Sequence, residues 1–258
     1  CANNTEKHRG SSSSNVDMRT LNEYYYAAFE PAVTRGGAYS VMAAYNELSG
    51  VPAVINPDIQ KILKDKWGLG FVVTDGGDFS QNVLFHEYGT SHAETIALAI
   101  KNGTDVMTDN EDVVKAAALE AYKSGMICEA DIDKALFNTM LARFRLGEFD
   151  EEHPFSDIDE NCVDCDKHRE INHRAALEQM VLLKNDGILP LDTKKSLAVI
   201  GLNGNANLMD WYTGYSSYNI SISEGLKEKF ADVKYDNGCD HVVIRSELTG
   251  RYLGVADD

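Results

Sequence analysis

The sequence of 258 residues has few cysteines, few cations and no long apolar run. Its 24 Lys and Arg are outnumbered by 41 Asp and Glu, giving a net charge of −17. This excess argues against a nucleic-acid partner, because affinity for nucleic acid depends on neutralising phosphates. No apolar stretch approaches the roughly 20 residues that cross a bilayer, so we expect no membrane partner. The N-terminus lacks an initiator Met and the apolar core of a signal peptide, which suggests a start within a longer protein.

The cysteines are too few and too scattered to cross-link a chain of this length; they are Cys1, Cys128, Cys162, Cys165 and Cys239. An odd number leaves one unpaired, which favours a reducing compartment and therefore a cytoplasmic location. Cys162 and Cys165, with His168 nearby, have the spacing of zinc ligands, but a second ligand pair is missing. Two free thiols in a linker are therefore the favoured interpretation, and we expect neither a metal nor a cofactor.

The first half of the chain alternates between short apolar runs and amphipathic segments. The apolar runs predict buried strands at Ala38–Tyr45, Phe71–Val73 and Asp105–Met107. The amphipathic segments predict helices at Met18–Val33, from Asn56 to Gly68, and at Ser91–Lys101, Glu111–Ser124 and Glu129–Leu146. In the first of these helices, Leu21, Tyr25, Ala28 and Phe29 have the spacing of one buried face. Such alternation implies parallel strands joined by crossover helices.

The second half has the pattern of another α/β domain. A polar, irregular stretch at Pro154–Asp166 suggests a linker, and a helix is expected at His168–Leu183. A strand at Ser196–Ile200, a helix at Glu224–Phe230 and a strand at Val233–Tyr235 then form a strand–helix–strand unit. The last stretch, Val242–Leu253, has the alternation of a β-hairpin.

Three residues at strand ends are candidates for chemistry, because reactive groups of parallel α/β folds gather at that edge. They are Tyr45, Asp75 and Asp109. Asp75 is the most informative, since it directly follows a strand and precedes two glycines that leave space beside it. An Asp that merely caps the next loop would have the same position, so both interpretations stay open here.

Several motifs in a fixed order resemble glycoside hydrolase family 3, which contains β-glucosidases and β-xylosidases. The resemblance rests on Asn3–Arg9, on Ser40–Ala53, on Trp67–Asp75, on Val181–Leu191 and on Lys195–Asn203. The segment Trp67–Asp75 is similar to the family's strand that ends in the nucleophilic Asp, and Val181–Leu191 to the entry of its second domain. The resemblance covers residues 1 to about 240.

The resemblance implies a retaining hydrolysis of terminal β-glycosidic bonds, with an oligosaccharide or glycoside as substrate. Asp75 becomes the nucleophile that forms a covalent glycosyl-enzyme. Arg9 becomes the residue that binds sugar hydroxyls, and Tyr45 the phenol beside the nucleophile. Most members have Trp after the nucleophile, whereas this sequence has Gly76 and Gly77, which affects the expected subsite preference rather than the reaction.

The fold class implied is α/β, with the C-terminal part of a (β/α)8-type barrel followed by the start of an α/β sandwich domain. The expected domains are residues 1–153 for the barrel part, 154–195 for a linker and connecting helix, 196–240 for the start of the second domain, and 241–258 for the start of an inserted β-rich, trefoil-like domain. Barrels of this type need about 250 residues, so only part of one is expected.

The family's Lys-His pair would lie upstream of residue 1, and its acid/base Glu beyond Asp258. We therefore expect the isolated chain to be an inactive fragment. The resemblance leaves the oligomeric state open.

Three other functions have weaker signals. Gly201-Leu-Asn-Gly204 follows a strand but lacks the third glycine of a dinucleotide site. His86 and His92 are six residues apart, whereas a zinc protease helix needs four, so both are expected to decorate the loop after the Asp75 strand. A glycan-binding protein without turnover is the remaining alternative. It differs from the enzyme in having no need of Asp75.

Overall fold

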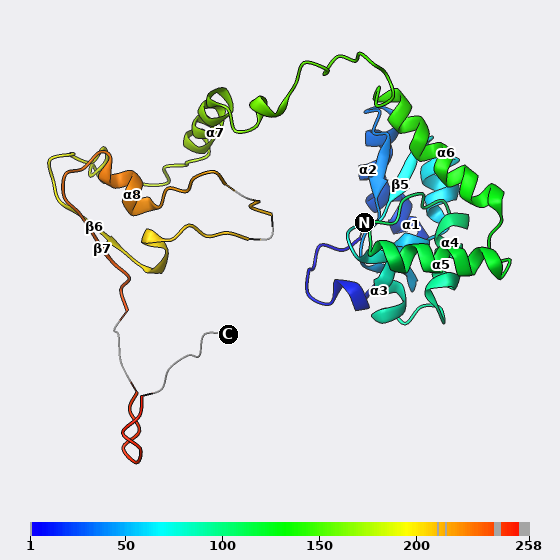
Figure 1. The fold of residues 1–258 in the computed structure, drawn as a ribbon, viewed down its shortest axis with the longest axis horizontal. Helices are drawn as coiled ribbons and strands as arrows, with labels where there is room; N and C mark the ends of the chain where they lie inside the picture. The colour runs from blue at the N-terminus through cyan, green and yellow to red at the C-terminus, as the bar shows by residue number, and fades with distance from the viewer. Residues whose placement is uncertain (1, 211, 215, 240–243, 253–258) are drawn as a thin grey trace. The chain divides into compact units, whose positions relative to one another are not determined.

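The computed structural model describes residues 2–210, 212–214, 216–239 and 244–252 (Figure 1). The chain divides into two compact units, residues 1–154 and 155–258, and each is described by itself. Cys1 and part of the hairpin expected at Val242–Leu253 lie outside the described residues. Among the helices that are described, none combines the length and the apolar character needed to cross a membrane.

The first unit is built on parallel strands, as the alternation predicts. Strand β2 (Ser40–Met42) pairs in parallel with β5 (Phe71–Val73), in a register that places Val41 beside Val72. On the other side of β5, Val106 forms a parallel bridge to Val73. The third expected strand is thus a single bridge rather than a regular strand. The order is β2, β5, then the segment around Val106, so the ends of all three meet at one edge.

The prediction that the β2 segment is a strand buried on both faces is wrong. The strand covers only Ser40–Met42, and Met42 is 59% exposed. Among the described residues β2 pairs with β5 alone, so its other side has no strand against it. Val72, which lies between two neighbours, is 1% exposed, as expected for a central strand.

A second sheet in this unit is made of three short strands. It consists of β1 (Ser13–Ser14), β3 (Glu47–Leu48) and β4 (Val51–Pro52). Strand β3 pairs in parallel with β1 and antiparallel with β4. This sheet ties the N-terminal segment to the loop that follows β2.

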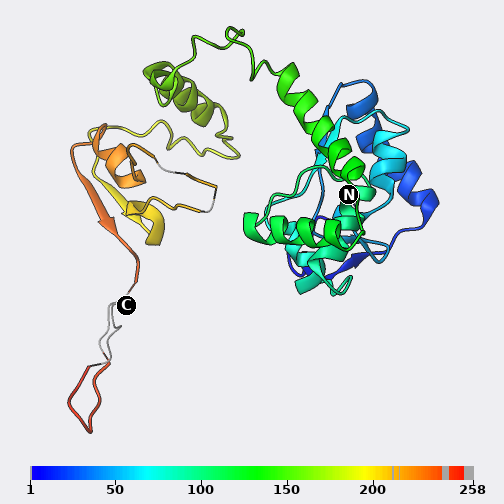
Figure 2. The ribbon, with the colours of Figure 1, turned by 45° about the vertical axis from the view of Figure 1, so that its right-hand side comes forward.

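Helices surround the strands of the first unit (Figures 1 and 2). The α-helices are α1 (Met18–Thr20), α2 (Tyr26–Thr34), α3 (Asp78–Leu84), α4 (His92–Lys101), α5 (Glu111–Lys123) and α6 (Glu129–Arg145). The 3₁₀- and π-helical segments are η1 (Arg9–Ser11), η2 (Leu21–Tyr25), η3 (Ala53–Ile55) and η4 (Ile59–Lys64). One core cluster gathers around Val54, Trp67 and Val72, and another around Phe79, Ile96 and Ala121.

The helix expected at Met18–Val33 is present, but its buried face differs from the prediction. Leu21, Tyr26 and Val33 are buried, whereas Ala28 and Phe29 are exposed. The cause is η2, a π-helical turn, in which hydrogen bonds span five residues instead of four. Leu21 and Tyr26, five residues apart, therefore lie on the same side of the helix. The buried positions that follow Leu21 are shifted by one residue relative to those of a regular α-helix.

Helix α3 is absent from the sequence-based predictions. It begins immediately after Gly77, whose backbone φ is +76°, a left-handed conformation that glycine adopts without strain. It ends at Leu84, and the backbone N–H groups of Phe85 and His86 donate to the carbonyl of Gln81. The helix thus fills the segment between Asp75 and His86.

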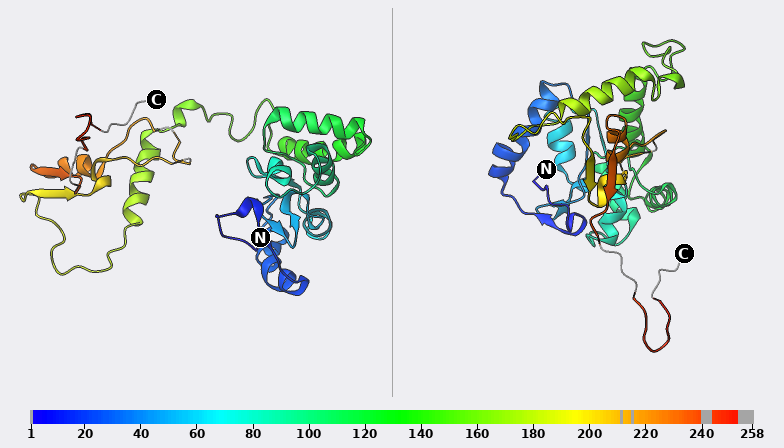
Figure 3. Two further views of the ribbon diagram at one scale, coloured as in Figure 1. Left: turned by 90° about the horizontal axis from the view of Figure 1, so that it is seen from below. Right: turned by 90° about the vertical axis from the view of Figure 1, so that its left-hand side faces the viewer.

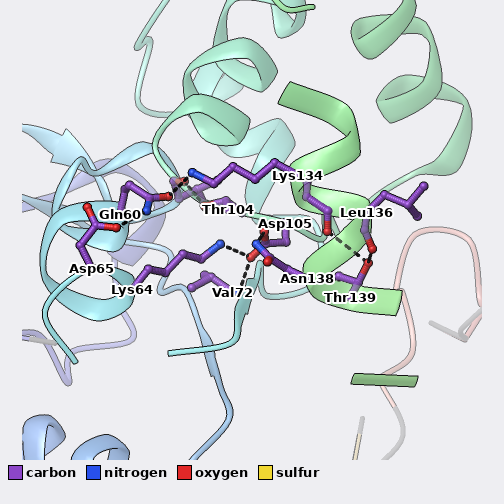
Figure 4. Close-up of polar contacts among 12 residues, drawn as sticks. Gln60, Lys64, Asp65, Val72, Thr104, Asp105, Lys134, Leu136, Asn138 and Thr139 are labelled. Atoms are coloured by element: carbon purple, nitrogen blue, oxygen red, sulfur yellow. Dashed lines mark hydrogen bonds and ion pairs between the residues drawn. The ribbon is translucent and has the colours of Figure 1, made fainter. Parts of the chain in front are cut away.

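A buried ion pair connects three elements of the first unit (Figure 4). Lys64 Nζ lies 2.5 Å from Asp105 Oδ2, and the two side chains are 7% and 2% exposed. The same oxygen accepts the backbone N–H of Val72 in β5, and Asp105 Oδ1 accepts from Asn138 Nδ2 of α6. Burial lowers the pKa of Lys64, and the attraction of Asp105 opposes that shift. The carboxylate therefore ties η4, β5 and α6 together.

The second unit contains a small parallel pair of strands. Strands β6 (Leu197–Ile200) and β7 (Val233–Asp236) lie side by side, with α8 (Ile222–Lys227) between them in sequence (Figure 3). The short turns are η5 (Glu160–Cys162) and η6 (Leu202–Asn205). This arrangement confirms the predicted strand–helix–strand unit. The two units together are of the α/β class.

Helix α7 (Asp166–Glu178) is shorter than predicted. The expected helix reached Leu183, but Met180 and Leu183 lie beyond its end, and with Leu177 they are exposed. In the described part of the final stretch, Arg245 and Tyr252 form an antiparallel bridge around a turn in which Gly250 N–H donates to Ser246. That turn is at the place predicted for the hairpin.

Candidate active site

Asp75 lies two residues beyond β5, at the edge where the parallel strands end. Thr74, which precedes it, is buried, and its hydroxyl oxygen accepts the backbone N–H of Thr108 at 2.8 Å. Its own backbone N–H donates to the carbonyl of Val106. Asp75 Oδ1 accepts the N–H of Gly76 at 2.6 Å, a contact that fixes the orientation of the carboxyl group. Asp75 is therefore held on a fixed backbone and is half-buried.

The two glycines after Asp75 leave open space. A Cβ placed on Gly76 or Gly77 would have no other atom within 4 Å. Gly77 N–H donates to the carbonyl of Thr108 at 2.8 Å, so this turn is tied to the segment after the Val106 bridge. The backbone here is constrained while the region beside Asp75 stays unfilled.

Tyr45 lies three residues beyond the end of β2 and reaches the same turn. Its hydroxyl donates to the carbonyl of Gly76 at 2.7 Å. Loss of solvent raises the pKa of the Tyr45 hydroxyl, and the neighbouring Asp75 carboxylate raises it further. The phenol is thus held in its protonated form beside Asp75, where it can donate a hydrogen bond.

Arg9 approaches Tyr45 from the N-terminal segment. Its guanidinium carbon lies 4.1 Å from the centre of the Tyr45 ring, within the range of a cation–π contact, and it pairs with the carboxylate of Glu6. The turn η1 that carries it packs closely on α3, because a Cβ on Gly10 would overlap the side chain of Gln81. A positive charge is thereby fixed at the edge that also carries Asp75.

Arg9, Tyr45 and Asp75 line one cleft of about 200 Å³, together with Asn3, Asn4 and Glu6. The structure thus brings together all three residues that the sequence singled out for the site. It does not bring in Asp109, the third strand-end candidate. Asp109 Oδ2 instead accepts the N–H of Ser80 in the first turn of α3, a helix-capping contact.

Asp78 is a further acidic residue that the sequence analysis missed. It is 2% exposed, and its Oδ2 is buried without a hydrogen-bond partner. Burial, followed by the charges of Asp75 and Asp109, raises the pKa of its carboxyl to about 8. At neutral pH Asp78 is therefore protonated. The sequence carried no signal for this burial, because it depends on helix α3, which the sequence pattern did not predict.

His86 lies in the loop after α3, as the sequence predicted, but its side chain is buried. Its side chain is 1% exposed, and Nε2 lies 2.7 Å from the carbonyl oxygen of Tyr45. Its Nδ1 lies 3.3 Å from Glu47 Oε1, an ion-pair distance, although the alignment does not make a hydrogen bond. No sequence pattern around His86 predicted that its side chain would be buried.

A second hollow, of about 110 Å³, is lined mainly by apolar side chains such as Val41, Leu63 and Trp67. Its one carboxylate, Asp58, accepts from the Tyr26 hydroxyl at 2.7 Å. It offers no set of converging reactive groups. Among the described residues there is no cluster of three or more His, Cys, Asp or Glu that could hold a metal ion, and Cys162 and Cys165 are free.

Residues 180–250 match the family described as the glycosyl hydrolase family 3 C-terminal domain. Over 91% of its length the chain is 33% identical to a β-xylosidase of Formosa agariphila, covering 36% of that protein. Over 88% of its length it is 33% identical to a β-xylosidase/α-L-arabinofuranosidase of Medicago sativa subsp. varia, covering 30% of it. The chain thus spans about a third of the length of the curated relatives it matches.

Solved structures of β-xylosidases and β-glucosidases are also similar to the chain. An exo-β-xylosidase of glycoside hydrolase family 3, in complex with a xylobiose aziridine activity-based probe, matches 90% of the chain with a TM-score of 0.77 and 28% identity, over 31% of its own length. A β-glucosidase from Erythrobacter marinus matches 88% of the chain with a TM-score of 0.75 and 27% identity, over 31% of its own length.

Proposed function

Given that the chain belongs to glycoside hydrolase family 3, we propose that it contributes the nucleophile and part of the sugar site of an enzyme that hydrolyses terminal β-glycosidic bonds. The observation that carries this proposal is the cleft that Arg9, Tyr45 and Asp75 share. The names of the relatives support β-xylosides and β-glucosides as the substrate class.

In the proposed reaction, the ionised Asp75 attacks the anomeric carbon and forms a covalent glycosyl-enzyme, which water then hydrolyses. A retaining enzyme needs a second carboxyl group about 5–5.5 Å from the first as acid/base. We assign that role to a Glu outside residues 1–258. Asp78 does not fit it, because its carboxyl is buried and has no opening of its own to the cleft.

Tyr45 and Arg9 are proposed to serve the nucleophile and the sugar. The Tyr45 hydroxyl is close enough to Asp75 to hydrogen-bond to the carboxylate or to a sugar hydroxyl once the Gly76 contact is exchanged. Arg9, half-exposed above the Tyr45 ring, can donate to sugar hydroxyls.

The parallel strands of residues 1–153 are proposed to be the C-terminal part of a (β/α)8-type barrel, and residues 196–240 the start of an α/β sandwich domain. Residues 154–195 would then be the linker and connecting helix, and residues 241–258 the start of an inserted β-rich domain. The parallel pairs β2–β5 and β6–β7 support two separate α/β cores.

The test is covalent labelling of the full-length protein with a mechanism-based fluorinated β-xyloside or β-glucoside. We expect the label on the peptide that contains Asp75, and Asp75→Asn should lower turnover by several powers of ten. Label on another carboxylate would refute the assignment of Asp75. Sugar binding without labelling or turnover would favour the glycan-binding alternative.

A further inference from the structure

Tyr45 contacts one segment, residues 76–86, through both its side-chain hydroxyl and its backbone carbonyl. Its hydroxyl donates to the carbonyl of Gly76, and its own carbonyl lies 2.7 Å from His86 Nε2. Gly76 and His86 stand at opposite ends of α3, since the helix begins at Asp78 and the N–H of His86 donates to Gln81 in its last turn. The length of α3 therefore sets the distance between the two groups that contact Tyr45, the Gly76 carbonyl and the His86 ring.

The chemistry of the His86 ring agrees with an anchoring role. A carbonyl oxygen only accepts hydrogen bonds, so Nε2 must carry a proton to bond to Tyr45. On the other side, Nδ1 lies 3.3 Å from an oxygen of Glu47, the first residue of β3. Glu47 is mostly buried, with a side chain 16% exposed, so its charge has little solvent around it. The two ring nitrogens thus face a carbonyl oxygen on one side and a carboxylate oxygen on the other.

We propose that His86 is a positioning residue for the reaction, holding Tyr45 beside Asp75 through the Tyr45 carbonyl, with Glu47 orienting the imidazole ring. This inference rests on the proposed glycosidase function. His86 lines no part of the cleft and would not touch the sugar. Its effect on the reaction passes through Tyr45, whose hydroxyl reaches the turn that follows the nucleophile.

The test compares His86→Leu, which removes both ring nitrogens, with His86→Gln, which keeps an N–H donor. In the full-length protein, using aryl β-xylosides or β-glucosides, we expect His86→Leu to lower kcat about ten- to a hundredfold with a smaller change in KM, because a displacement of about 1 Å in a reacting group has effects of that size. His86→Gln should recover most of the loss. His92→Gln is the matched control, since the His92 ring packs on Phe79 rather than on Tyr45, and it should leave kcat unchanged.

Two further measurements separate positioning from a purely structural role. If His86 acts through Tyr45, its substitution should cost little more in a Tyr45→Phe background, so the two effects should not add. A crystal structure of the His86→Leu protein should show the contact between the Tyr45 hydroxyl and Gly76 lengthened or broken. This structural result is independent of turnover, so it tests the anchor even where the proposed hydrolysis is absent.

Wild-type kcat in folded His86→Leu, full additivity with Tyr45→Phe, or an unmoved Tyr45 would each overturn the proposal. Should His86→Leu fail to fold, Glu47→Gln provides the second variant. Glu47→Gln removes the carboxylate that faces the His86 ring. It should lower kcat, by less than is expected for His86→Leu. A wild-type kcat in the Glu47→Gln protein would also contradict the proposal.

Discussion

At the scale of single residues, three acids that lie close enough in the structure to affect one another have three different environments. Asp75 is half-buried and accepts a backbone N–H, Asp109 caps the first turn of α3, and Asp78 is buried with one unpartnered oxygen. Since like charges disfavour each other, the one with the least solvent keeps its proton. The result is a site in which a buried, neutral Asp78 lies close to two more exposed carboxyl groups.

The raised pKa of Asp78 makes a prediction about stability. The folded-state value of about 8 exceeds the ordinary value of 3.8. Between about pH 4 and pH 8 the folded protein keeps a proton that the unfolded chain has released, so the free energy of unfolding falls as the pH rises through this window. Asp78→Asn cannot ionise, so its free energy of unfolding should not fall in this window, and the difference from the unmodified protein should be on the order of 5 kcal/mol at pH 8. Melting temperatures at pH 5 and pH 8 would measure it.

Asp131→Asn is a control in which the pH dependence of stability should have the opposite sign. Hydrogen bonds from Cys128 lower the pKa of Asp131, so its contribution to stability is present above the unfolded value and is lost as the pH falls through the folded one. Asp131→Asn should therefore destabilise at pH 7 and have little effect near pH 2. A constant difference between Asp78→Asn and the unmodified protein across pH 4–8 would contradict the burial assigned to Asp78.

Tyr45→Phe removes one oxygen from the cleft and leaves the ring under Arg9. We expect kcat/KM for aryl β-xylosides or β-glucosides to fall about tenfold to a hundredfold, because the hydroxyl lies beside the nucleophile. The lost hydrogen bond should cost only about 1 kcal/mol of stability. Steady-state kinetics and a thermal melt would separate the two effects, and Tyr122→Phe, on an exposed part of α5, should change neither. Unchanged kinetics in Tyr45→Phe would remove Tyr45 from the site.

At the scale of elements, the pair Lys64–Asp105 fastens η4, β5 and α6 in the same unit. Asp105→Asn leaves the buried ammonium of Lys64 without its counter-charge and should destabilise the protein by about 3–5 kcal/mol. The exposed pair Glu111–Lys115 on α5 is the control, since Glu111→Gln should cost less than about 0.5 kcal/mol. Chemical denaturation of both variants would measure the difference. Equal effects would mean that solvent reaches Lys64.

Helices with a clear N-cap and a regular apolar face could be predicted from the sequence. Elements whose formation depends on contacts with distant residues could not. Helix α4 has Ser91 as its N-cap and a regular apolar face, so its bounds were within one residue of the prediction. Helix α3 has seven residues and no such repeat, and it forms because Phe79 and Asn82 are buried by contacts from elsewhere in the chain. The π-helical turn η2 breaks the spacing that sequence periodicity assumes, which is why Phe29 was wrongly assigned to the buried face.

At the scale of the whole molecule, the alternation of strands and helices was enough to predict the α/β class and the edge on which Asp75 lies. The proximity of Tyr45 to Asp75 followed from the ends of two adjacent parallel strands as well as from the family resemblance. That of Arg9 followed from the resemblance alone, because more than 30 residues separate it from Tyr45 in sequence. His86 and Asp78 could not be assigned in this way, since their importance comes from burial, which depends on residues distant in the sequence.

The isolated 258-residue chain should associate in solution and should not release nitrophenol from aryl β-xylosides or β-glucosides. It spans about a third of its relatives' length, and long apolar side chains such as Val181 and Leu183 are 77% and 93% exposed. Size-exclusion chromatography and a hydrolysis assay would test this. A monomer that melts cooperatively and cleaves either substrate would contradict it.

The π-helical turn at Leu21–Tyr25 also has a consequence for sequence length. It holds one residue more than an α-helix needs to bring Leu21 and Tyr26 to the same side. A relative with one residue fewer in this stretch could therefore make both contacts with an unbroken α-helix. In an alignment of related proteins, a single-residue gap is expected inside this helix, where insertions and deletions are otherwise rarely tolerated, and the helix would absorb it without moving the core.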